Sequence, residues 1–295
     1  MKTVFKGVAT ALITPMKQNG EVDYEAYGRL IDWQIEQGIN ALVACGTTGE
    51  CATLDDNEHK EVIRFCVERA NKRVPVIAGT GGNDTAYAIK LTKHAKEVGA
   101  DACLLVTPYY NKATQKGLIK MFGEIAESVD LPMIVYNVPS RTGVNIEPAT
   151  YKALTQFKNI RGIKEANGNI SKAVETMSLI GDEIDLYSGN DDQIVPFMSI
   201  GGKGVISVLS NLLPKETVEI CSLFFDGKIK ESAKKQLEYK ALIDALFCEV
   251  NPIPVKSAMW KMGYGAEVLR SPLTVMEDDH KQKLFELMKK AGAIK

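Results

Sequence analysis

Eight short apolar runs recur along the chain and are separated by stretches with helical spacing. The runs are Gly7–Ile13, Ala41–Cys45, Pro75–Gly79, Ala102–Thr107, Pro132–Asn137, Ile160–Lys164, Ile184–Ser188 and Gly204–Val208. Each run is nearly continuous rather than alternating, which is typical of parallel strands covered on both faces. Between the first two runs, Asp23–Gln37 places apolar residues at helical spacing, with Asp23 as N-cap and Gly38 just past the end. The pattern therefore predicts eight strand–helix units.

This repeat predicts an α/β fold, namely a (β/α)8 TIM barrel. Eight units within about 225 residues match the size of such a barrel. The main alternative is a doubly wound open sheet, which usually has fewer strands. The glycine turn at Gly79–Gly82 lacks the GxGxxG spacing of dinucleotide-binding sheets, so we favour the barrel.

The pattern changes past Gly227, where helical stretches follow one another without a strand between them. These stretches are Lys228–Glu249, Pro252–Met262 and Glu277–Ala291. We expect a catalytic barrel over residues 1–226 and a C-terminal helical domain over residues 227–295, with Asn251–Pro254 as a turn inside it.

The composition is that of a globular protein, with 295 residues that are 45% hydrophobic and 25% charged, and a net charge of -1. No segment forms a basic face, which argues against nucleic acid and anionic membranes as partners. The first residues, Met1–Lys6, lack the apolar core of a signal peptide. No apolar run approaches the ~20 residues that span a bilayer. We therefore expect a cytoplasmic protein.

Cysteine and histidine give no sign of a disulfide framework or a metal site. The six cysteines have no CxxC spacing, and most of them lie in apolar runs, so we expect reduced, buried thiols. The three histidines are scattered and form no HxxxH or HxH pair. We expect no metal.

Lys164 ends the sixth apolar run, at the end of a barrel strand where active sites lie. Alternation along a strand puts Ile160, Gly162 and Lys164 on one face. In the commoner case the strand stops there and the ammonium reaches water. In the other case Lys164 projects into an enclosed site, where desolvation favours a neutral amine that can form a Schiff base with a carbonyl. Lys164 by itself leaves both open.

The other strand ends gather hydroxyl groups and an arginine. They are Gly46–Glu50, Thr107–Asn111, Tyr136–Gly143, Ser188–Asn190 and Ile206–Ser207. This composition suits carbonyl chemistry on an anionic substrate without a metal. Each piece also has a plainer interpretation: a tight turn at Gly46–Gly49, a packed aromatic at Tyr136, and a solvated loop charge at Arg141.

Taken together, these stretches resemble the pyruvate-dependent class I aldolase superfamily, over nearly the whole chain from Gly7 onward. The likeness is carried by GTTGE at 46–50, TPYYN at 107–111, YNVPSRTG at 136–143 and GIKEA at 162–166. Further support comes from Gly204–Ser207 and Asn251–Lys256. Two threonines in the first motif, and Arg141 in the third, favour the dihydrodipicolinate synthase family over the N-acetylneuraminate lyases.

The resemblance implies condensation of pyruvate with L-aspartate 4-semialdehyde to give 4-hydroxy-tetrahydrodipicolinate, on the diaminopimelate and lysine route. It makes Lys164 the Schiff-base lysine and Tyr136 the general acid/base. Thr47 would link Tyr136 to Tyr110, a residue that reaches in from a neighbouring subunit. The only covalent carrier would be the imine between Lys164 and pyruvate, without a cofactor, and the assembly would be a homotetramer built as a dimer of dimers.

The resemblance also implies the substrate-binding residues. Thr48 would hold the pyruvate carboxylate, Arg141 would bind the carboxylate of the semialdehyde, and Gly189 and Ile206 would shape the floor through backbone groups. Two alternatives are kept. One is a related aldolase acting on a sugar acid, such as N-acetylneuraminate or 2-keto-3-deoxygluconate lyase, and the other is a barrel that binds a 2-oxo acid without catalysis.

Feedback-sensitive members of the family bind lysine at a dimer interface. By motif, that site falls at Cys51, Ala52, Asp56, His59, Asn83, Tyr87 and Tyr109. Here Cys51 is a weak acceptor, and Tyr87 is a neutral phenol where sensitive members have an anion. Asp56 supplies a carboxylate, but its side chain has a shorter reach than that of glutamate. A buried ammonium without such partners is costly, so we expect lysine to inhibit weakly or not at all.

Overall fold

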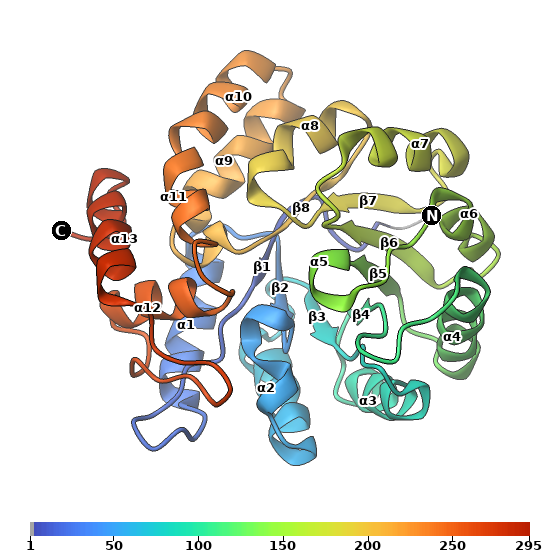
Figure 1. Cartoon of the computed structure of the whole chain (residues 1–295), viewed down its shortest axis with the longest axis horizontal. Helices are drawn as coiled ribbons and strands as arrows, with labels where there is room; N and C mark the ends of the chain where they lie inside the picture. Colours follow the sequence, from blue (N-terminus) through green and yellow to red (C-terminus); the bar gives the residue numbers. More distant parts are fainter. Residues whose placement is uncertain (1–2) are drawn as a thin grey trace.

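The computed structural model describes residues 3–295 and contains a closed barrel of eight parallel strands in chain order (Figure 1). The strands are β1 Gly7–Ala11, β2 Ala41–Ala44, β3 Val76–Gly79, β4 Ala102–Val106, β5 Met133–Asn137, β6 Ile160–Glu165, β7 Asp185–Ser188 and β8 Gly204–Ser207. Each predicted run contains one strand, except that β6 continues one residue past its run, to Glu165. The predicted TIM barrel is confirmed, and the open sheet is wrong because β1 pairs with β8.

Helices cover the outside of the barrel and connect its strands (Figure 1). They are α1 Tyr24–Glu36, α2 Asp56–Ala70, α3 Thr85–Glu97, α4 Gln115–Ser128, α5 Pro139–Thr142, α6 Pro148–Leu154, α7 Ile170–Ile180, α8 Ile194–Ser199 and α9 Pro214–Phe225. The predicted capping of α1 is confirmed: the Asp23 side chain accepts from Ala26 N at 2.9 Å, and Gly38 follows in the left-handed region at φ +85°.

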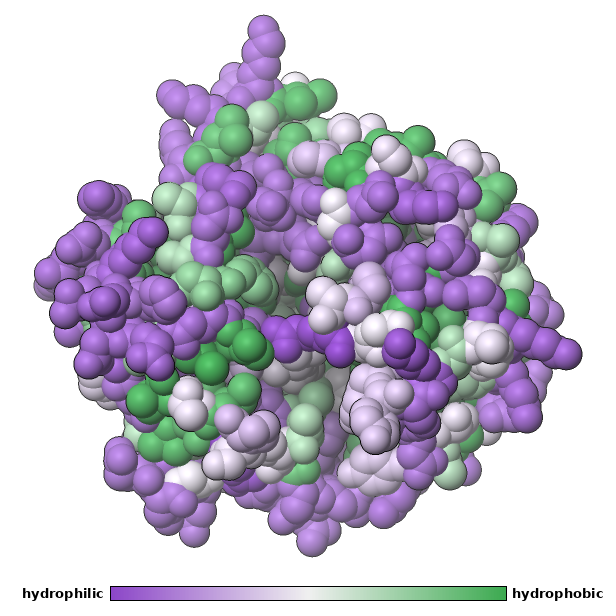
Figure 2. Space-filling model, viewed as in Figure 1, coloured by the Kyte–Doolittle hydropathy of each residue, from purple (hydrophilic) through white to green (hydrophobic). Residues whose placement is uncertain are grey.

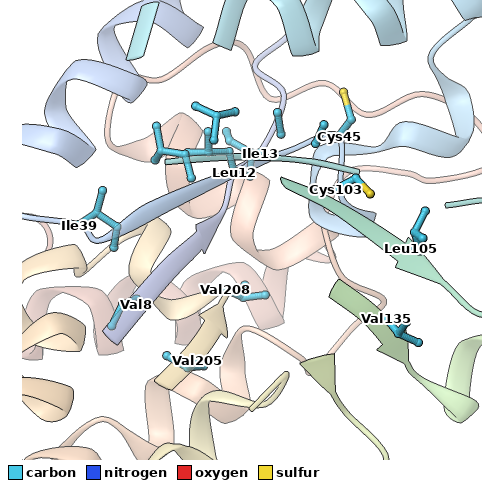
Figure 3. Close-up of a cluster of buried hydrophobic side chains, with 14 of the residues drawn as sticks. Val8, Leu12, Ile13, Ile39, Cys45, Cys103, Leu105, Val135, Val205 and Val208 are labelled. Carbon is cyan, nitrogen blue, oxygen red and sulfur yellow. The ribbon is translucent and has the colours of Figure 1, made fainter. Parts of the chain in front are cut away.

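Alternating strand residues build two separate cores. On β5, Ile134 and Tyr136 point into the barrel, whereas Val135 joins the outer core between strands and helices. Figure 3 shows members of this outer core, among them Val8, Val135 and Val205 on three strands. Phe5 and Tyr187 stack at 4.3 Å between ring centroids in the inner core and fill the barrel near the start of β1.

A bulge changes the phase of β6. Ile160 pairs with Met133 but Gly162 pairs with Ile134, so Arg161 is an extra residue. Ile160 therefore belongs to the outer core, and the prediction that it shares a face with Lys164 is wrong. Simple alternation assumes an unbroken register, and the bulge breaks it.

The C-terminal segment is helical, as predicted, and consists of α10 Ile229–Glu238, α11 Lys240–Ala245, α12 Ile253–Lys261 and α13 Asp278–Lys290. The predicted single helix over 228–249 is wrong. It breaks at Tyr239, whose N–H bonds to Gln236 O rather than to the carbonyl four residues back, and α11 then ends at Ala245. The domain division at residue 226 stays a prediction. Within residues 3–295 no helix is both long and apolar enough to cross a bilayer.

Candidate active site

A cavity of about 700 Å³ lies at the C-terminal ends of the strands, and Figure 2 shows a hollow near the middle of this face. Six of the residues expected at the site line it: Thr47, Thr48, Tyr136, Arg141, Lys164 and Gly189. The segment Phe247–Asn251, between α11 and α12, supplies part of the wall. Residues from five separate strand ends and from the C-terminal segment thus meet at one place.

Lys164 is enclosed rather than solvated, with a residue exposure of 6%. It lies opposite Tyr136 in the register of β5 and β6, and its Nζ is 4.2 Å from the centroid of that ring. Burial lowers the pKa of Lys164 to about 7, although the buried Asp191 carboxylate opposes the shift. A large share of the lysine is therefore a free amine at neutral pH, which is the form that attacks a carbonyl.

The pKa of Tyr136 is shifted in the opposite direction to that of Lys164. Burial raises the pKa of its phenol to about 12, while the Arg141 charge and a hydrogen bond with Thr47 act against the rise. The phenol is consequently protonated at neutral pH and can donate a proton. A free amine and a protonated phenol stand on adjacent strands, as general acid–base chemistry at an imine requires.

Thr48 and Arg141 are joined through Asn251, a residue that the sequence placed in a turn and in a supporting motif but not at the site. The Asn251 amide donates to Thr48 Oγ1 at 3.1 Å, and Arg141 Nη2 donates to the Asn251 carbonyl at 2.9 Å. The Asn251 Oδ1 atom is buried without a hydrogen-bond partner among the described residues. Thr48 and Asn251 stand 203 residues apart, so no local pattern could have paired them.

Gly189 and Ile206 occupy different positions. A Cβ atom on Gly189 would lie 2.7 Å from Ala166 Cβ and 3.2 Å from Lys164 Cε, so a side chain there would crowd the lysine. Ile206 is fully buried in the inner core of the barrel and is not among the residues that line the cavity. The structure thus brings Gly189, but not Ile206, to the cavity wall.

Tyr110 lies outside the cavity of its own chain. It follows β4 on a loop with φ +69°, and 94% of it is exposed. A smaller apolar cavity of about 290 Å³ adjoins the main one and shares Thr47, Val138, Arg141, Val250 and Asn251 with it. Tyr110 is not among the residues that line either cavity.

Two buried carboxylates near Lys164 were missed. Asp191 Oδ2 accepts from the N–H groups of Val208 and Leu209 at 3.0 and 2.9 Å, and burial raises its pKa. Glu165 accepts from Asn137 at 2.9 Å and Tyr151 at 2.8 Å, and burial raises its pKa to about 7. Both fasten the strand ends around Lys164, and only their position beside strand ends could have pointed to them.

The residues expected at a lysine site fall into two groups. Cys51, Ala52 and Tyr109 line the smaller cavity, whereas Asp56 begins α2 and Tyr87 lies on α3. Asp56 already accepts from Lys60 Nζ at 2.7 Å and Lys90 Nζ at 3.0 Å.

The remaining two residues of the expected lysine site, His59 and Asn83, contact backbone carbonyl groups of the same chain. His59 is buried with its Nε2 atom 2.8 Å from Gly79 O, and Asn83 donates to Tyr109 O at 3.3 Å. The expected site is therefore partly occupied by contacts within the chain.

Comparison with known proteins agrees with this geometry. The Dihydrodipicolinate synthetase family matches residues 4–291. The 4-hydroxy-tetrahydrodipicolinate synthases of Lachnoclostridium phytofermentans and Acetivibrio thermocellus are 55% and 52% identical to the chain, each over 99% of both sequences. The crystal structure of dihydrodipicolinate synthase from Thermotoga maritima is 43% identical, covers 99% of this chain and 100% of its own, and has a TM-score of 0.96. The chain belongs to the dihydrodipicolinate synthetase family.

Proposed function

We propose that this chain is a lyase that condenses pyruvate with L-aspartate 4-semialdehyde to give 4-hydroxy-tetrahydrodipicolinate, in diaminopimelate and lysine biosynthesis. The observation that carries the proposal is Lys164, a buried lysine that borders a cavity, has a pKa of about 7 and lies opposite a protonated Tyr136. Family membership over nearly the full chain supports the same reaction.

The reaction follows from an amine at this position. Lys164 Nζ attacks the carbonyl carbon of pyruvate, and the oxygen leaves as water to give an imine. The imine nitrogen withdraws electrons, so the pyruvate methyl loses a proton and the imine becomes an enamine. The enamine carbon attacks the aldehyde carbon of the second substrate, whose oxygen takes up a proton. The amino group of that substrate then displaces Lys164 and closes the ring, so no cofactor is needed.

Tyr136 would move the protons in these steps, because its phenol faces the lysine from the next strand. Thr47 hydrogen-bonds with Tyr136 and borders both cavities. We propose that Tyr110 from a neighbouring subunit enters the smaller cavity and continues the relay to the surface. The 94% exposure of Tyr110 in a single chain supports this arrangement.

Thr48 and Arg141 would hold the two substrate carboxylates, Thr48 that of pyruvate and Arg141 that of the semialdehyde. Arg141 suits the task because a guanidinium binds a carboxylate through two parallel hydrogen bonds. Its tether to Asn251 fixes the side chain at the cavity wall before substrate arrives. Gly189 would leave room beside the lysine, and Ile206 would support the floor from below.

The reaction is tested by trapping and by a coupled assay. Pyruvate with borohydride should add one reduced pyruvyl group per chain at Lys164, located by peptide mass. The coupled assay should then show turnover with aspartate semialdehyde and far less with sugar aldehydes. Trapping with preference for a sugar aldehyde would favour the sugar-acid aldolase, and no trapping would favour a barrel that only binds a 2-oxo acid.

We also propose a cytoplasmic homotetramer in which pairs of subunits share sites. Inactive Tyr110→Phe chains mixed with inactive Lys164→Ala chains should recover activity, because each hybrid pair holds one site with both native groups. Random exchange restores up to about a quarter of the sites. Absence of recovery, despite exchange proven by mass, would mean that each site is built from one chain.

A further inference from the structure

A second buried lysine lies near the site but does not line its cavity. Lys256, on α12, has its Nζ atom 2.5 Å from Glu50 Oε1, and the side chains of the pair are 2% and 1% exposed. Their positions in the sequence are 206 residues apart. The pair therefore joins the C-terminal segment to the strand end of β2, which carries Thr47 and Thr48.

Glu50 ends the short 3-10 turn Thr47–Gly49. Its backbone is left-handed at φ +54°, a conformation that costs energy in any residue with a side chain. The Glu50 N–H bonds to Thr47 O at 3.2 Å, and the Glu50 carbonyl accepts from Thr53 N at 3.0 Å. The direction of the Thr47–Thr48 turn thus depends on holding Glu50 in this conformation.

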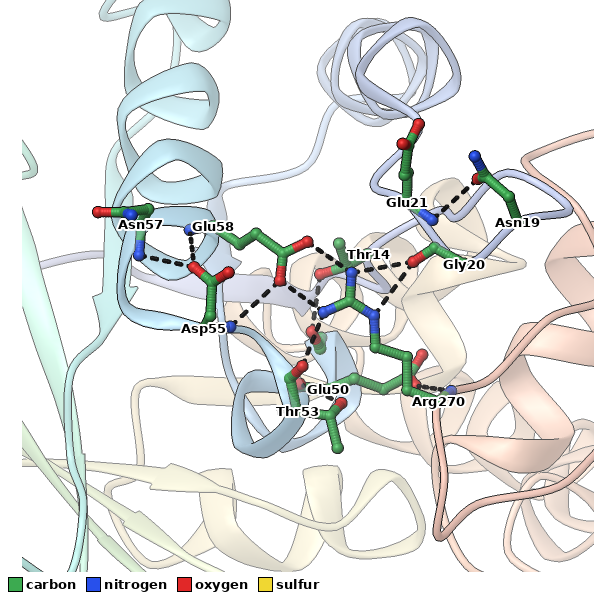
Figure 4. A network of polar contacts seen from close by, with 11 residues as sticks. Thr14, Asn19, Gly20, Glu21, Glu50, Thr53, Asp55, Asn57, Glu58 and Arg270 are labelled. Carbon is green, nitrogen blue, oxygen red and sulfur yellow. Dashed lines mark hydrogen bonds and ion pairs between the residues drawn. The ribbon is translucent and has the colours of Figure 1, made fainter.

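Arg270 holds the same segment at a second point (Figure 4). Its backbone N–H donates to Glu50 Oε2 at 3.2 Å, so both carboxylate oxygens of Glu50 are bound by the C-terminal segment. The Arg270 guanidinium donates to Thr53 O at 2.7 Å and makes two bonds of 2.6 Å to Glu58, the capping-box residue of α2. The contacts of the C-terminal segment to Glu50, Thr53 and Glu58 therefore hold the turn, the segment after it and the start of α2 in fixed positions.

We propose that Lys256 and Arg270 are positioning residues that act through Glu50 to aim the Thr47–Thr48 turn at pyruvate. This inference rests on the proposed function, in which Thr48 binds the pyruvate carboxylate. Lys256 and Arg270 line neither cavity, so they would act on substrate only through the turn. A hydrophobic pair could fill the same volume but would offer no carboxylate to hold, whereas Lys256 Nζ and the Arg270 N–H each bind one oxygen of Glu50.

The test compares Lys256→Met, which keeps the length and removes the charge, with Lys235→Met as its matched control. Lys235 likewise pairs with a glutamate, Glu219, but this pair joins α10 to α9 and its side chains are 20% and 49% exposed. The pyruvate concentration that gives half-maximal borohydride trapping at Lys164 should rise at least tenfold in Lys256→Met and stay within twofold in Lys235→Met. Lys256→Arg should recover most of the loss.

A double-mutant cycle with Thr48→Val separates positioning from general loosening. If Lys256 acts through the turn, Thr48→Val should weaken trapping strongly in the native background and hardly at all in Lys256→Met. Independent, multiplying effects would overturn the inference. Should Lys256→Met fold poorly, Glu50→Gln with Lys256→Met removes both buried charges and serves as the variant in the same cycle.

Hydrogen exchange without substrate keeps the two proposals distinguishable. Backbone amides of residues 46–53 should exchange faster in Lys256→Met than in the native chain, with no such change in Lys235→Met. Faster exchange together with failed trapping in the native chain would sink the proposed function and leave the positioning of the turn standing. Native trapping with unchanged exchange and unchanged half-saturation in Lys256→Met would overturn the inference.

Discussion

Lys164 and Lys256 are both buried, but Lys164 faces a cavity and Lys256 contacts a carboxylate. Lys164 borders the cavity and rests against the Tyr136 ring, and burial lowers its pKa to about 7. Burial also lowers the pKa of Lys256, but the Glu50 carboxylate in contact with it acts in the opposite direction. Burial by itself therefore does not make a lysine a nucleophile. The amine must also face a space that substrate can enter.

The two regions also differ in how their charges are balanced. At the C-terminal segment, Glu50 and Lys256 satisfy each other, which makes the contact costly to break by removing one partner. At the cavity, Asp191 is held by the backbone of the chain after β8 and acts on Lys164 only through its charge. The first arrangement fixes a position, and the second leaves an amine free to react.

The largest effect should come from exchanging the cavity lysine for arginine. Lys164→Arg should abolish borohydride trapping and lower kcat/KM by roughly a thousandfold or more, because a guanidinium stays charged and does not form an imine. Mass spectrometry of trapped peptides, with the coupled assay, measures both losses.

Lys256→Arg is the matched control for this exchange. A guanidinium can keep the ion pair with Glu50, so trapping at Lys164 should persist in this variant. Pyruvyl label on Lys256, or on any lysine other than Lys164, would contradict the contrast between the two lysines.

Arg141 lies between the two regions, since it lines the cavity and binds the Asn251 carbonyl. Arg141→Ala should raise the semialdehyde KM and lower kcat/KM for that substrate by roughly ten- to a hundredfold, the loss of about one charge-assisted contact. Arg141→Lys should recover only part of it, because an ammonium does not reproduce the two parallel hydrogen bonds. Equal loss for pyruvate and semialdehyde would make Arg141 structural.

The sequence predicted the barrel well because a buried parallel strand leaves a continuous apolar run. Eight such runs contain the eight strands apart from Glu165 of β6, and their ends carry most of the cavity residues. The errors came from features without a local signal. The bulge at Arg161 moved Ile160 to the other face, and the break at Tyr239 interrupted an otherwise helical pattern.

Contacts between distant segments could not be predicted at all. Asn251 reaches Thr48 across 203 residues and Lys256 reaches Glu50 across 206, and periodicity describes only neighbours along one element. The lowered pKa of Lys164 could not be predicted from the sequence either. Its position at a strand end was readable, but enclosure by Tyr136, Gly189 and the C-terminal segment decides its pKa.

A smaller effect should appear in the pH profile of imine formation. Only the unprotonated amine attacks pyruvate, and the pKa of Lys164 is lowered from its ordinary value to about 7. The trapping rate at low pyruvate should therefore be flat above pH ~7 and fall about tenfold per pH unit below it. The profile is measured by stopping the trapping reaction at fixed times across the pH range and reading the extent of labelling from intact mass.

Asp191→Asn sharpens this profile, because the Asp191 charge raises the pKa of Lys164. Removing that charge should move the acid limb to lower pH and leave the plateau rate of imine formation close to native. An acid limb that stays in place, or moves to higher pH, would show that another group controls the titration.

The smallest effect is expected from free L-lysine. It concerns a third charged group, Asp56, which is paired within the chain. Asp56 already binds Lys60 and Lys90, and these hydrogen bonds lower its pKa to about 2. Both bonds end on Asp56 Oδ2, so an incoming ammonium would meet Oδ1 beside two ammonium charges of its own sign, and Tyr87 offers it a neutral phenol. One missing charge-assisted contact costs the effector ~1.5–3 kcal/mol, or roughly ten- to a hundredfold in affinity.

Lysine should therefore inhibit weakly or not at all, as calorimetric titration and initial rates over rising lysine would show. Lys90→Met removes one of the two ammonium charges at Asp56 Oδ2 without touching the cavity, so this variant should bind lysine more tightly than the native chain does. Submillimolar binding with clear inhibition in the native chain would contradict the expectation. In that case Asp56→Ala should abolish the binding, because Asp56 would be accepting the effector despite its two internal partners.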